Sequence, residues 1–278
     1  MAVGRAAAIV NPALSFKNLK TGLVGIYECE ADDEAAEMLL KAVEEFFKNQ
    51  GFKYLIGPMD GSTWHKYRFA ESEGGEFFLD VSNPAWYPEQ FLKAGFEPIA
   101  KYYSSRSATH KSESSRVQNF VERFKSRGVT IRNFDVNNFE REIRAIYDIS
   151  TASFKGNFLY TQIAFEEMAA MYAPLKGIID PRFVLIAENS EKRPLAFIFA
   201  VQDMLSKDAK KLVIKTVAAI PGSEARGLGT LLVEMIHERA AEHGFTEIIH
   251  ALMHESNTSM NILSGEIFCR YVLFGKSL

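Results

Sequence analysis

Apolar and polar residues follow one another along the chain in patterns that predict two successive sets of strands and helices. In the second set, apolar residues spaced at three and four predict one helix from about residue 138 to 147 and another over 161–175. Short apolar runs bounded by turn residues predict strands. The strands expected in this set span residues 129–134, 182–187, 196–201, 211–220, 246–253 and 268–274. Further helices are expected over residues 230–243 and, more briefly, from Asn257.

The first set is shorter and repeats the later part of the second. A strand is expected over residues 22–27, and apolar residues at helical spacing predict a helix over 32–49. This helix is expected to end at a glycine in Gly51-Phe52, just as the later helix ends before Gly244-Phe245. In both places a strand is expected to follow. We therefore interpret the chain as two similar halves.

A polar segment joins these halves. Residues 104–115 are rich in serine, and a short helix is expected over 117–127. Residues 104–128 hold six basic and two acidic side chains, a local charge of 6 − 2 = +4. The segment is interpreted as a solvated linker or, alternatively, as a patch that attracts phosphates or an acidic acceptor. The expected division is residues 1–104, a linker with a short helix over 105–128, and residues 129–278.

Composition excludes several classes of function. The chain has 278 residues and a formal net charge of −3, so no overall field draws nucleic acid or a membrane. Cys29 and Cys269 share no metal or redox spacing and are expected to be buried thiols in a reducing compartment. The apolar start is too short for a signal peptide, and no run approaches the ~18 apolar residues of a membrane span. We expect a cytoplasmic protein, monomeric or homodimeric.

The stretch from Ala219 to Leu232 carries the clearest chemical signal. An expected strand runs into a loop with Pro221 and Gly222, and the loop ends in Gly227-Leu-Gly229 where a helix is expected to begin. Glycines let backbone amides approach a ligand, and the first turn of a helix leaves amides without partners. Together with the helix dipole, such amides favour a phosphate or pyrophosphate. An ordinary strand–turn–helix connection is the alternative interpretation.

The spacing in this loop excludes two other phosphate-binding motifs. A dinucleotide fingerprint needs a third glycine three residues after Gly229, where the chain has Leu232. A nucleotide triphosphatase loop needs Gly-Lys-Ser/Thr, but Thr230 follows Gly229 without a lysine. Neither a dinucleotide nor a nucleoside triphosphate is therefore indicated.

The remaining pattern resembles the pyrophosphate loop of the GNAT N-acyltransferase superfamily, which grips coenzyme A. In that family a strand and a proline lead to Gln/Arg-x-x-Gly-x-Gly/Ala at the start of a helix. Pro221 lies six residues before Gly227, and Arg226 directly precedes this glycine, but the usual Gln/Arg position is Glu224. The expected elements over residues 129–278 also follow the order of the family. The resemblance implies an α+β (α/β) fold of two tandem GNAT-like mixed-sheet domains.

The first half resembles a partial, degenerate copy of the same fold. Residues 83–96 look like the family's terminal Asn…Gly-Phe motif. Where the second half has its glycine-rich loop, residues 28–34 contain five carboxylates and no glycine. Like charge would repel a pyrophosphate there at short range. We therefore expect only the second half to bind coenzyme A, with the first as a support or an acceptor-recognition module.

The resemblance also implies how acyl-coenzyme A binds. In the family, the strands before and after the loop and helix splay apart, and the pantetheine arm pairs with exposed backbone like an added strand. Asn257 corresponds to the asparagine that holds this arm, and it also suits a helix cap. The expected cofactor-binding residues are Val217, Ala218, Ala219, Ile220, Ala225, Arg226, Gly227, Leu228, Gly229, Thr230 and Asn257.

Catalytic residues are less clearly indicated. The family's tyrosine, seven residues after that asparagine, is replaced by Ser264, a far weaker acid, so proton delivery through water or from Tyr271 is considered instead. His250, His254 and Glu255 are available to take the proton of the acceptor amine, and His250 is the candidate base. The two histidines stand about 13 Å apart on one strand at ~3.3 Å per residue, so no metal site is expected. Ordinary packing is the alternative for each.

Two segments are candidates for the acceptor site. Residues 57–68 combine tight turns with aromatic rings, an imidazole and a guanidinium, which suit a carboxylate-bearing acceptor. Residues 154–160 connect two expected helices, and the resemblance implies that this connection lines the acceptor pocket. Simple packing between elements is the alternative for both segments. The expected acceptor-binding residues are Trp64, His65, Tyr67, Arg68, Phe154, Asn157 and Tyr160.

The resemblance thus implies a coenzyme A-dependent N-acyltransferase, most simply an acetyltransferase. It would move the acyl group of acetyl-CoA or another acyl-CoA to a small primary amine by direct attack in a ternary complex, without a metal. Positioning supplies much of the rate of such a step. A catalytically silent acyl-CoA sensor or scaffold is the alternative that Glu224 and Ser264 favour. Transfer of a longer acyl chain or an aminoacyl group is a third possibility.

Overall fold

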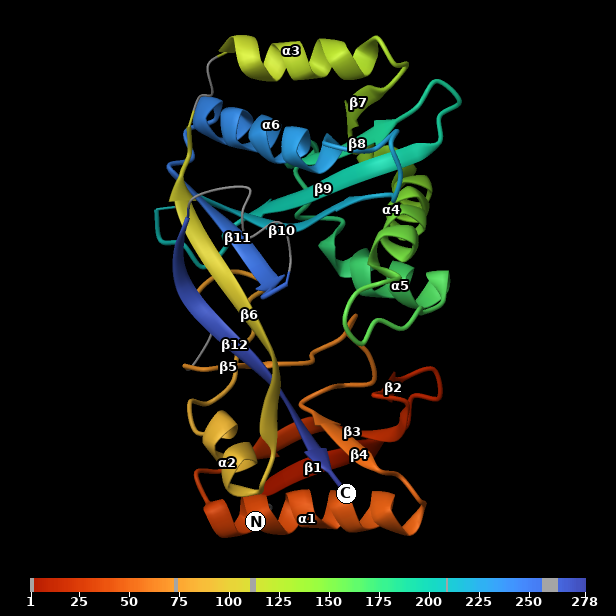
Figure 1. Ribbon diagram of the computed structural model, residues 1–278. Helices are drawn as coiled ribbons and strands as arrows, with labels where there is room; N and C mark the ends of the chain where they lie inside the picture. The colour runs from red at the N-terminus through yellow and green to blue at the C-terminus, as the bar shows by residue number, and fades with distance from the viewer. Residues whose placement is uncertain (1–2, 73–74, 111–113, 209, 257–264) are drawn as a thin grey trace.

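The computed structural model describes every residue except 1–2, 73–74, 111–113, 209 and 257–264. The helices α1 and α2 lie toward one end of the elongated molecule, and α3 and α6 lie at the other (Figure 1). The first half contains β1 (Gly4–Ile9), β2 (Ser15–Phe16), β3 (Leu19–Cys29), α1 (Asp33–Asn49), β4 (Tyr54–Gly57), β5 (Phe69–Ala70), α2 (Tyr87–Lys93) and β6 (Glu97–Ala108). The second half contains α3 (Ser114–Lys125), β7 (Thr130–Asn133), α4 (Phe139–Phe154), α5 (Phe165–Tyr172), β8 (Val184–Glu188), β9 (Pro194–Gln202), β10 (Lys211–Ala219), α6 (Leu228–Glu242), β11 (Glu247–His254) and β12 (Glu266–Ser277).

The expected elements of the second half are present, with boundaries shifted by a few residues. The strand β10 and the helix α6 flank the glycine-rich loop as the sequence predicts. The expected helix over 161–175 is shorter, because α5 begins only at Phe165 and gives way to a single 3-10 turn over Ala173–Leu175. The expected helix from Asn257 lies outside the described residues.

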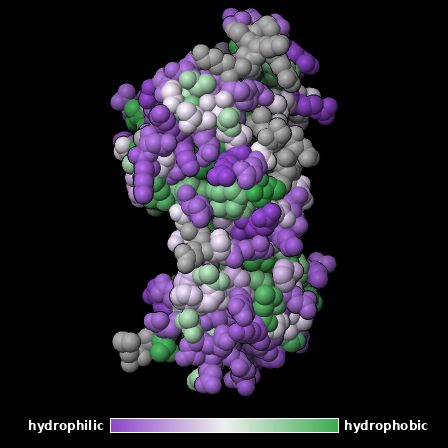
Figure 2. All heavy atoms as spheres, turned by 90° about the vertical axis from the view of Figure 1, so that its left-hand side faces the viewer, coloured by the Kyte–Doolittle hydropathy of each residue, from purple (hydrophilic) through white to green (hydrophobic). Residues whose placement is uncertain are grey.

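One mixed sheet runs through the whole molecule in the order β1-β3-β4-β12-β6-β11-β10-β9-β8-β7. Its pairs are antiparallel except β3 with β4 and β10 with β11, which are parallel because a helix crosses over between the two strands. The α+β (α/β) architecture of two similar mixed-sheet halves is therefore confirmed. Figure 2 shows that the outline of the molecule narrows between the two halves.

The two halves exchange strands at the centre of this sheet. Although β6 follows the helices of the first half, it lies between β12 and β11. Conversely β12, the last strand of the chain, pairs with β4 of the first half. Each half is thus completed by a strand from the other, and β12 and β6 cross between them (Figure 1).

This exchange changes the account of the polar segment. The expected linker begins at residue 105, but β6 continues to Ala108, so residues 105–108 belong to the sheet. Two serines of this strand are buried, since Ser104 is 0% and Ser105 is 6% exposed. The hydroxyl of Ser104 accepts the backbone N–H of Leu252 at 3.0 Å, which satisfies a polar group inside the sheet. The division of the chain into two domains remains a prediction.

Helices cover both faces of the second half of the sheet. Successive side chains of a strand point to opposite faces. Phe197 and Phe199 of β9 accordingly pack in one cluster with α4, whereas Ile198 and Ala200 pack in another with α6 and α3. The cluster on the α4 side continues into the first half, so the core beneath the site is shared.

Three findings for the described residues concern membrane spans, metal sites and cysteines. In this part of the chain, no helix is both long and apolar enough to cross a membrane. No group of three or more His, Cys, Asp or Glu side chains in these residues is arranged to hold a metal ion. Cys29 and Cys269 are both buried and free of a disulfide.

Candidate functional site

The loop between β10 and α6 lines a shallow, open cavity of about 400 Å³. It is formed by the segment that the sequence singles out, from the end of β10 to the first turn of the helix. The residues that line it are Ala219, Ile220, Gly222, Ser223, Ala225, Arg226, Gly227, Gly229 and Thr230. Seven of these belong to the expected cofactor-binding set, while Leu228 is wholly buried beneath the loop.

The start of α6 leaves backbone amides available to a ligand. Gly227 precedes the helix with φ of 90°, a left-handed conformation that favours glycine, and no side chain caps the helix there. The backbone N–H of Leu228 is used within the turn, donating to Ala225 at 3.0 Å. Across the described residues, no hydrogen bond to a protein acceptor is made by the backbone N–H groups of Arg226, Gly227, Gly229 and Thr230.

Glu224, which departs from the family pattern, is held away from these amides by a cation. Its carboxylate accepts from the guanidinium of Arg193 at 2.5 Å and from the side-chain amide of Asn189 at 3.1 Å. Both partners belong to the turn between β8 and β9. The pairing lowers the repulsion that an unpaired carboxylate would exert on a phosphate at this loop.

Beyond the loop, β10 and β11 separate as the resemblance implies. They pair only from Lys211 with Glu247 to Ile214 with His250, and the ladder ends there. Two irregularities accompany the separation, one at Lys215 in the pairing of β10 with β9 and one between His250 and Met253 in the pairing of β11 with β6. Bulges of this kind bend strands and open a sheet locally.

The open edge of β10 is fixed from both sides. Thr216 to Ala219 remain paired with β9, so the strand stays extended along the opening. The hydroxyl of Ser153 on α4 donates to the backbone carbonyl of Ala219, and the N–H of Ile220 donates to Leu195 at 2.8 Å. Residues 217–220 therefore lie where the sequence places the pantetheine arm, and their role in binding remains a prediction.

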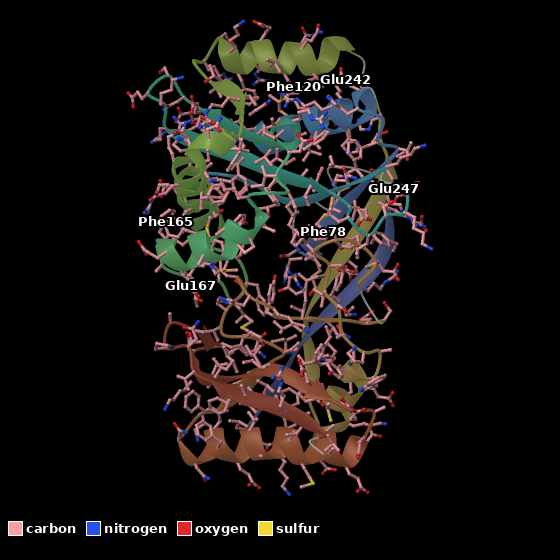
Figure 3. All side chains as sticks on the ribbon, turned by 180° about the vertical axis from the view of Figure 1, so that it is seen from behind. Phe78, Phe120, Phe165, Glu167, Glu242 and Glu247 are labelled. Atoms are coloured by element: carbon pink, nitrogen blue, oxygen red, sulfur yellow. The ribbon has the colours of Figure 1, made fainter. Side chains whose placement is uncertain are left out.

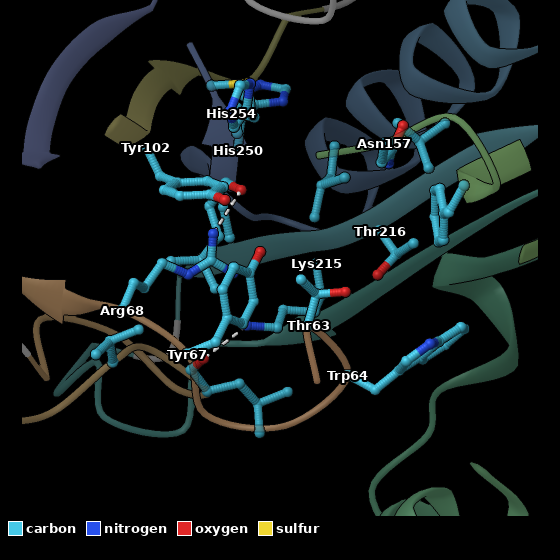
Figure 4. Close-up of a pocket in the computed structure, with 18 of the residues that line it drawn as sticks. Thr63, Trp64, Tyr67, Arg68, Tyr102, Asn157, Lys215, Thr216, His250 and His254 are labelled. Carbon is cyan, nitrogen blue, oxygen red and sulfur yellow. Dashed lines mark hydrogen bonds between the residues drawn. The ribbon is translucent and has the colours of Figure 1, made fainter. Parts of the chain in front are cut away.

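A second cavity of about 780 Å³ opens between the separated strands and is lined by both halves of the chain. The first half contributes the loop 63–68 and residues 79–82, and the second contributes β10, β11 and the segment after α4. Figure 4 shows side chains from these segments converging on one space. All seven expected acceptor-binding residues line this cavity: Trp64, His65, Tyr67, Arg68, Phe154, Asn157 and Tyr160.

Trp64 joins the two expected acceptor segments. Its indole N–H donates to the backbone carbonyl of Thr161 at 2.9 Å, and its ring lies 6.4 Å from that of Phe154 and 5.9 Å from that of Tyr160. The hydroxyl of Tyr160 is buried without a hydrogen-bond partner among the described residues. These contacts show that the cluster packs the two segments together, and its role in binding an acceptor remains a prediction.

His65 links the loop to α5. One ring nitrogen lies 3.3 Å from the carboxylate of Glu167, and the other lies 3.1 Å from the hydroxyl of Ser62. Glu167 projects from α5 toward the first half of the molecule (Figure 3). This contact holds one rim of the cavity together across the two halves.

His250 lies on the wall of the cavity as a neutral imidazole. Burial, with a smaller contribution from His110, lowers its pKa to about 4. Its Nε2 lies 3.3 Å from Nε2 of His237, whose pKa burial lowers to about 3. His254 also lines the cavity, and burial lowers its pKa as well. Both histidines can accept a hydrogen bond at neutral pH, but His250 is a weak base.

The other expected catalytic residues lie differently. Tyr271 is 0% exposed and does not line the cavity in the described structure. Its hydroxyl donates to Asp80 at 2.6 Å and lies 3.0 Å from that of Ser104. Burial and the Asp80 charge raise the pKa of Tyr271, which makes it a poor proton donor. Ser264 and Asn257 lie outside the described residues, so their roles remain predictions.

The sequence analysis missed Lys215, which lies at the bulge of β10 and lines the cavity. Its ammonium group donates to the backbone carbonyl of Leu79 at 2.8 Å. Burial, aided by the positive charge of Arg68, lowers its pKa to about 7. The available signal was a lysine that interrupts the apolar run of an expected buried strand.

No protein-family model and no curated protein matches the sequence. Solved structures match it at low identity. A GCN5-related N-acetyltransferase from Sphaerobacter thermophilus has a TM-score of 0.54 and 15% identity over 99% of this chain and 76% of that one. A tandem GNAT protein from the clavulanic acid biosynthesis pathway has a TM-score of 0.50 and 10% identity over 94% and 76%. A GCN5-related glucosamine N-acetyltransferase region of a fungal multi-domain GH3 β-N-acetylglucosaminidase has a TM-score of 0.57 and 12% identity over 99% and 31%.

Proposed function

Because the chain has the fold of the GCN5-related N-acetyltransferases, we propose that it is a coenzyme A-dependent N-acyltransferase, most simply an acetyltransferase. In this proposal the second half binds acyl-CoA, and both halves form the site of a small primary amine. The acyl group passes to the amine by direct attack while both substrates are bound.

The observation that carries the proposal is the start of α6. Four backbone N–H groups of one turn lack protein acceptors among the described residues, at the positive end of a helix dipole. Gly227 and Gly229 keep Cβ atoms out of the way. This turn follows directly on the strand that opens into the larger cavity, which supports a ligand with a diphosphate at one end and a reactive group at the other.

The reaction needs one bond to form and one to break. The amine nitrogen bonds to the thioester carbonyl carbon, the carbon–sulfur bond breaks, and coenzyme A leaves as a thiol. The nitrogen gives up a proton, for which His250 on the cavity wall is the proposed acceptor, and water supplies the proton of the thiol. Because the pKa of His250 is about 4, we expect the amine to enter largely neutral.

Two measurements on the wild-type protein test this proposal. Titration calorimetry with acetyl-CoA measures binding, and a thiol-release assay over a panel of primary amines measures transfer. Binding together with turnover on at least one amine is the expected result. Binding without turnover on any amine would favour the acyl-CoA sensor, and no binding would overturn both functions.

A further inference from the structure

A buried guanidinium faces the larger cavity without a carboxylate partner. Arg68 is only 7% exposed, and its guanidinium carbon lies 4.0 Å from the ring centre of Tyr67 and 4.3 Å from that of Tyr102. Its one hydrogen bond among the described residues is long, 3.5 Å to the carbonyl of Leu252. A guanidinium has five N–H donors, so most of this group's capacity remains for a ligand.

A second cation lies in the same cavity. The ammonium of Lys215 hydrogen-bonds to the carbonyl of Leu79, and the charge of Arg68 acts on it strongly enough to help lower its pKa. Figure 4 shows both side chains reaching the space between the loop 63–68 and β10. Two positive groups have thus been brought together in a poorly solvated place.

The charge of Asp80 opposes the lowering of the Lys215 pKa, but in the described structure its carboxylate forms no ion pair with the lysine and is hydrogen-bonded to other groups. Asp80 accepts from the hydroxyl of Tyr271 and from the backbone N–H groups of Glu76 and Val81, and Glu167 is paired with His65. In the described part of the chain, no carboxylate forms an ion pair with Arg68 or Lys215. Because unpaired buried charge is unfavourable, the arrangement suits an anion that arrives from outside.

We propose that Arg68 and Lys215 form a subsite for the carboxylate of the acceptor, so the acceptor is an amino acid or a similar amine with a free carboxylate. This inference rests on the proposed function, which identifies the amine as the group that reacts. The planar guanidinium, held against two nearly perpendicular phenol rings, matches the two oxygens of a carboxylate, and the lysine adds a point charge. Its place at the bulge, where β10 and β11 separate, sets the amine close to the opening expected to hold the thioester.

The first test is the choice of acceptor. With acetyl-CoA and the wild-type protein, kcat/KM is measured for amino acids, for the same amino acids as primary amides, and for phosphorylated amines. We expect at least 100-fold higher kcat/KM for a carboxylate acceptor than for its amide. An equal or higher value for the amide, or a preference for the phosphorylated amine, would overturn the proposal.

The second test is a set of variants with matched controls. Arg68→Met should lower kcat/KM for the carboxylate acceptor about 100-fold, and Lys215→Met should raise its KM about tenfold, with little change for neutral amides. Arg106→Met and Lys211→Met are the controls, because each removes a surface cation that is paired with a carboxylate, Glu266 or Glu247. Neither control should change kcat/KM or KM for the carboxylate acceptor. Equal losses for neutral and carboxylate acceptors would contradict a carboxylate subsite.

A third test needs neither a variant nor turnover. The pH dependence of Lys215 labelling by an amine-reactive reagent, read by peptide mass spectrometry, should have its midpoint near pH 7 in the free protein. An amino acid that binds should raise this midpoint by at least one unit, and its amide should not. A midpoint unmoved by every amino acid tested would overturn the subsite, even where acetyl-CoA binds. A protein that does not bind acetyl-CoA but shows the shift would instead overturn the proposed transferase and keep the subsite.

Discussion

The two halves of the molecule contain the same strand–helix–strand unit, but one is closed and the other open. In the first half, the carboxylate of Asp32 caps α1 and accepts the backbone N–H groups of Glu34 and Ala35, both at 3.0 Å. In the second half, Gly227 occupies the equivalent position before α6 and offers no cap. The comparison teaches that a helix start binds a ligand only if the chain leaves its amides unsatisfied.

The strands of the two units differ in the same way: the space beside β3 is filled, whereas the space beside β10 is open. In the first half the backbone beyond the paired part of β3 is already occupied, because Met59 donates to Val24 at 2.8 Å and Ile26 donates to the carboxylate of Asp60 at 2.6 Å. In the second half, the equivalent separation of β10 and β11 opens into the cavity of about 780 Å³. This difference supports the proposal that acyl-CoA binds in the second half and that the first half forms part of the acceptor site.

The largest effect is expected from closing the open unit. Gly227→Asp places a carboxylate beside the free amides, as Asp32 does in α1, and should lower the affinity for acetyl-CoA at least 100-fold, or about 2.7 kcal/mol. Gly227→Asn is the matched control, since asparagine tolerates the left-handed conformation and carries no charge. It should lose much less affinity by calorimetry. Equal losses in both variants would show that capping of the amides or backbone strain, and not charge, controls binding.

The next effect is expected at the bulge of β10, where Lys215 stands. The folded-state pKa of Lys215 is about 7, below its unfolded value, so between pH 7 and about 10 the unfolded chain binds more protons. The stability of the wild type should therefore rise with pH relative to Lys215→Met, by at most ~1.4 kcal/mol per pH unit. Urea unfolding of both proteins from pH 6 to 9.5 checks this. Parallel curves would contradict the lowered pKa.

A smaller effect is expected from opening the closed unit. Asp32→Ala removes the cap of α1 and should lower the free energy of unfolding by about 1 kcal/mol. The affinity for acetyl-CoA should not change, because the first half is not expected to bind it. Chemical denaturation and calorimetry measure the two quantities. A loss of acetyl-CoA affinity at unchanged stability would indicate that acetyl-CoA binds the first half, which would contradict the account.

The smallest effect is expected at Glu224, where the open loop keeps one carboxylate. Glu224→Gln removes this charge and frees Arg193, so the affinity for acetyl-CoA should rise a few-fold, less than ~1 kcal/mol at an exposed position. Glu191→Gln, in the neighbouring turn, is the control and should have no such effect. An equal gain in both variants would mean that only the overall charge matters.

Much of the second half could be predicted from sequence because its signals are local. Apolar spacing indicates α4, β10 and α6, and the glycines indicate the open turn between them. Trp64 and Arg68 stand out in a turn-rich loop and line the larger cavity, but their role in binding an acceptor remains a prediction.

The strand exchange and the electrostatics could not be predicted in this way. The local pattern of β12 is the same whether it pairs with β4 or with a strand of its own half, so its partner is decided by distant parts of the chain. Likewise, β6 carries serines that suit a linker until Tyr271 and Leu252 are seen to satisfy Ser104. The pKa of Lys215 depends on burial and on Arg68, which lies 147 positions earlier in the sequence (215 − 68).

The central claim, that the open turn before α6 holds the diphosphate of acyl-CoA, is tested most directly by amide chemical shifts. In an NMR titration of the ¹⁵N-labelled protein with acetyl-CoA, the largest changes should occur at Arg226, Gly227, Gly229 and Thr230. The capped amides of Glu34 and Ala35 should stay unchanged. Saturable binding that leaves the amides of residues 226–230 unmoved would contradict the account.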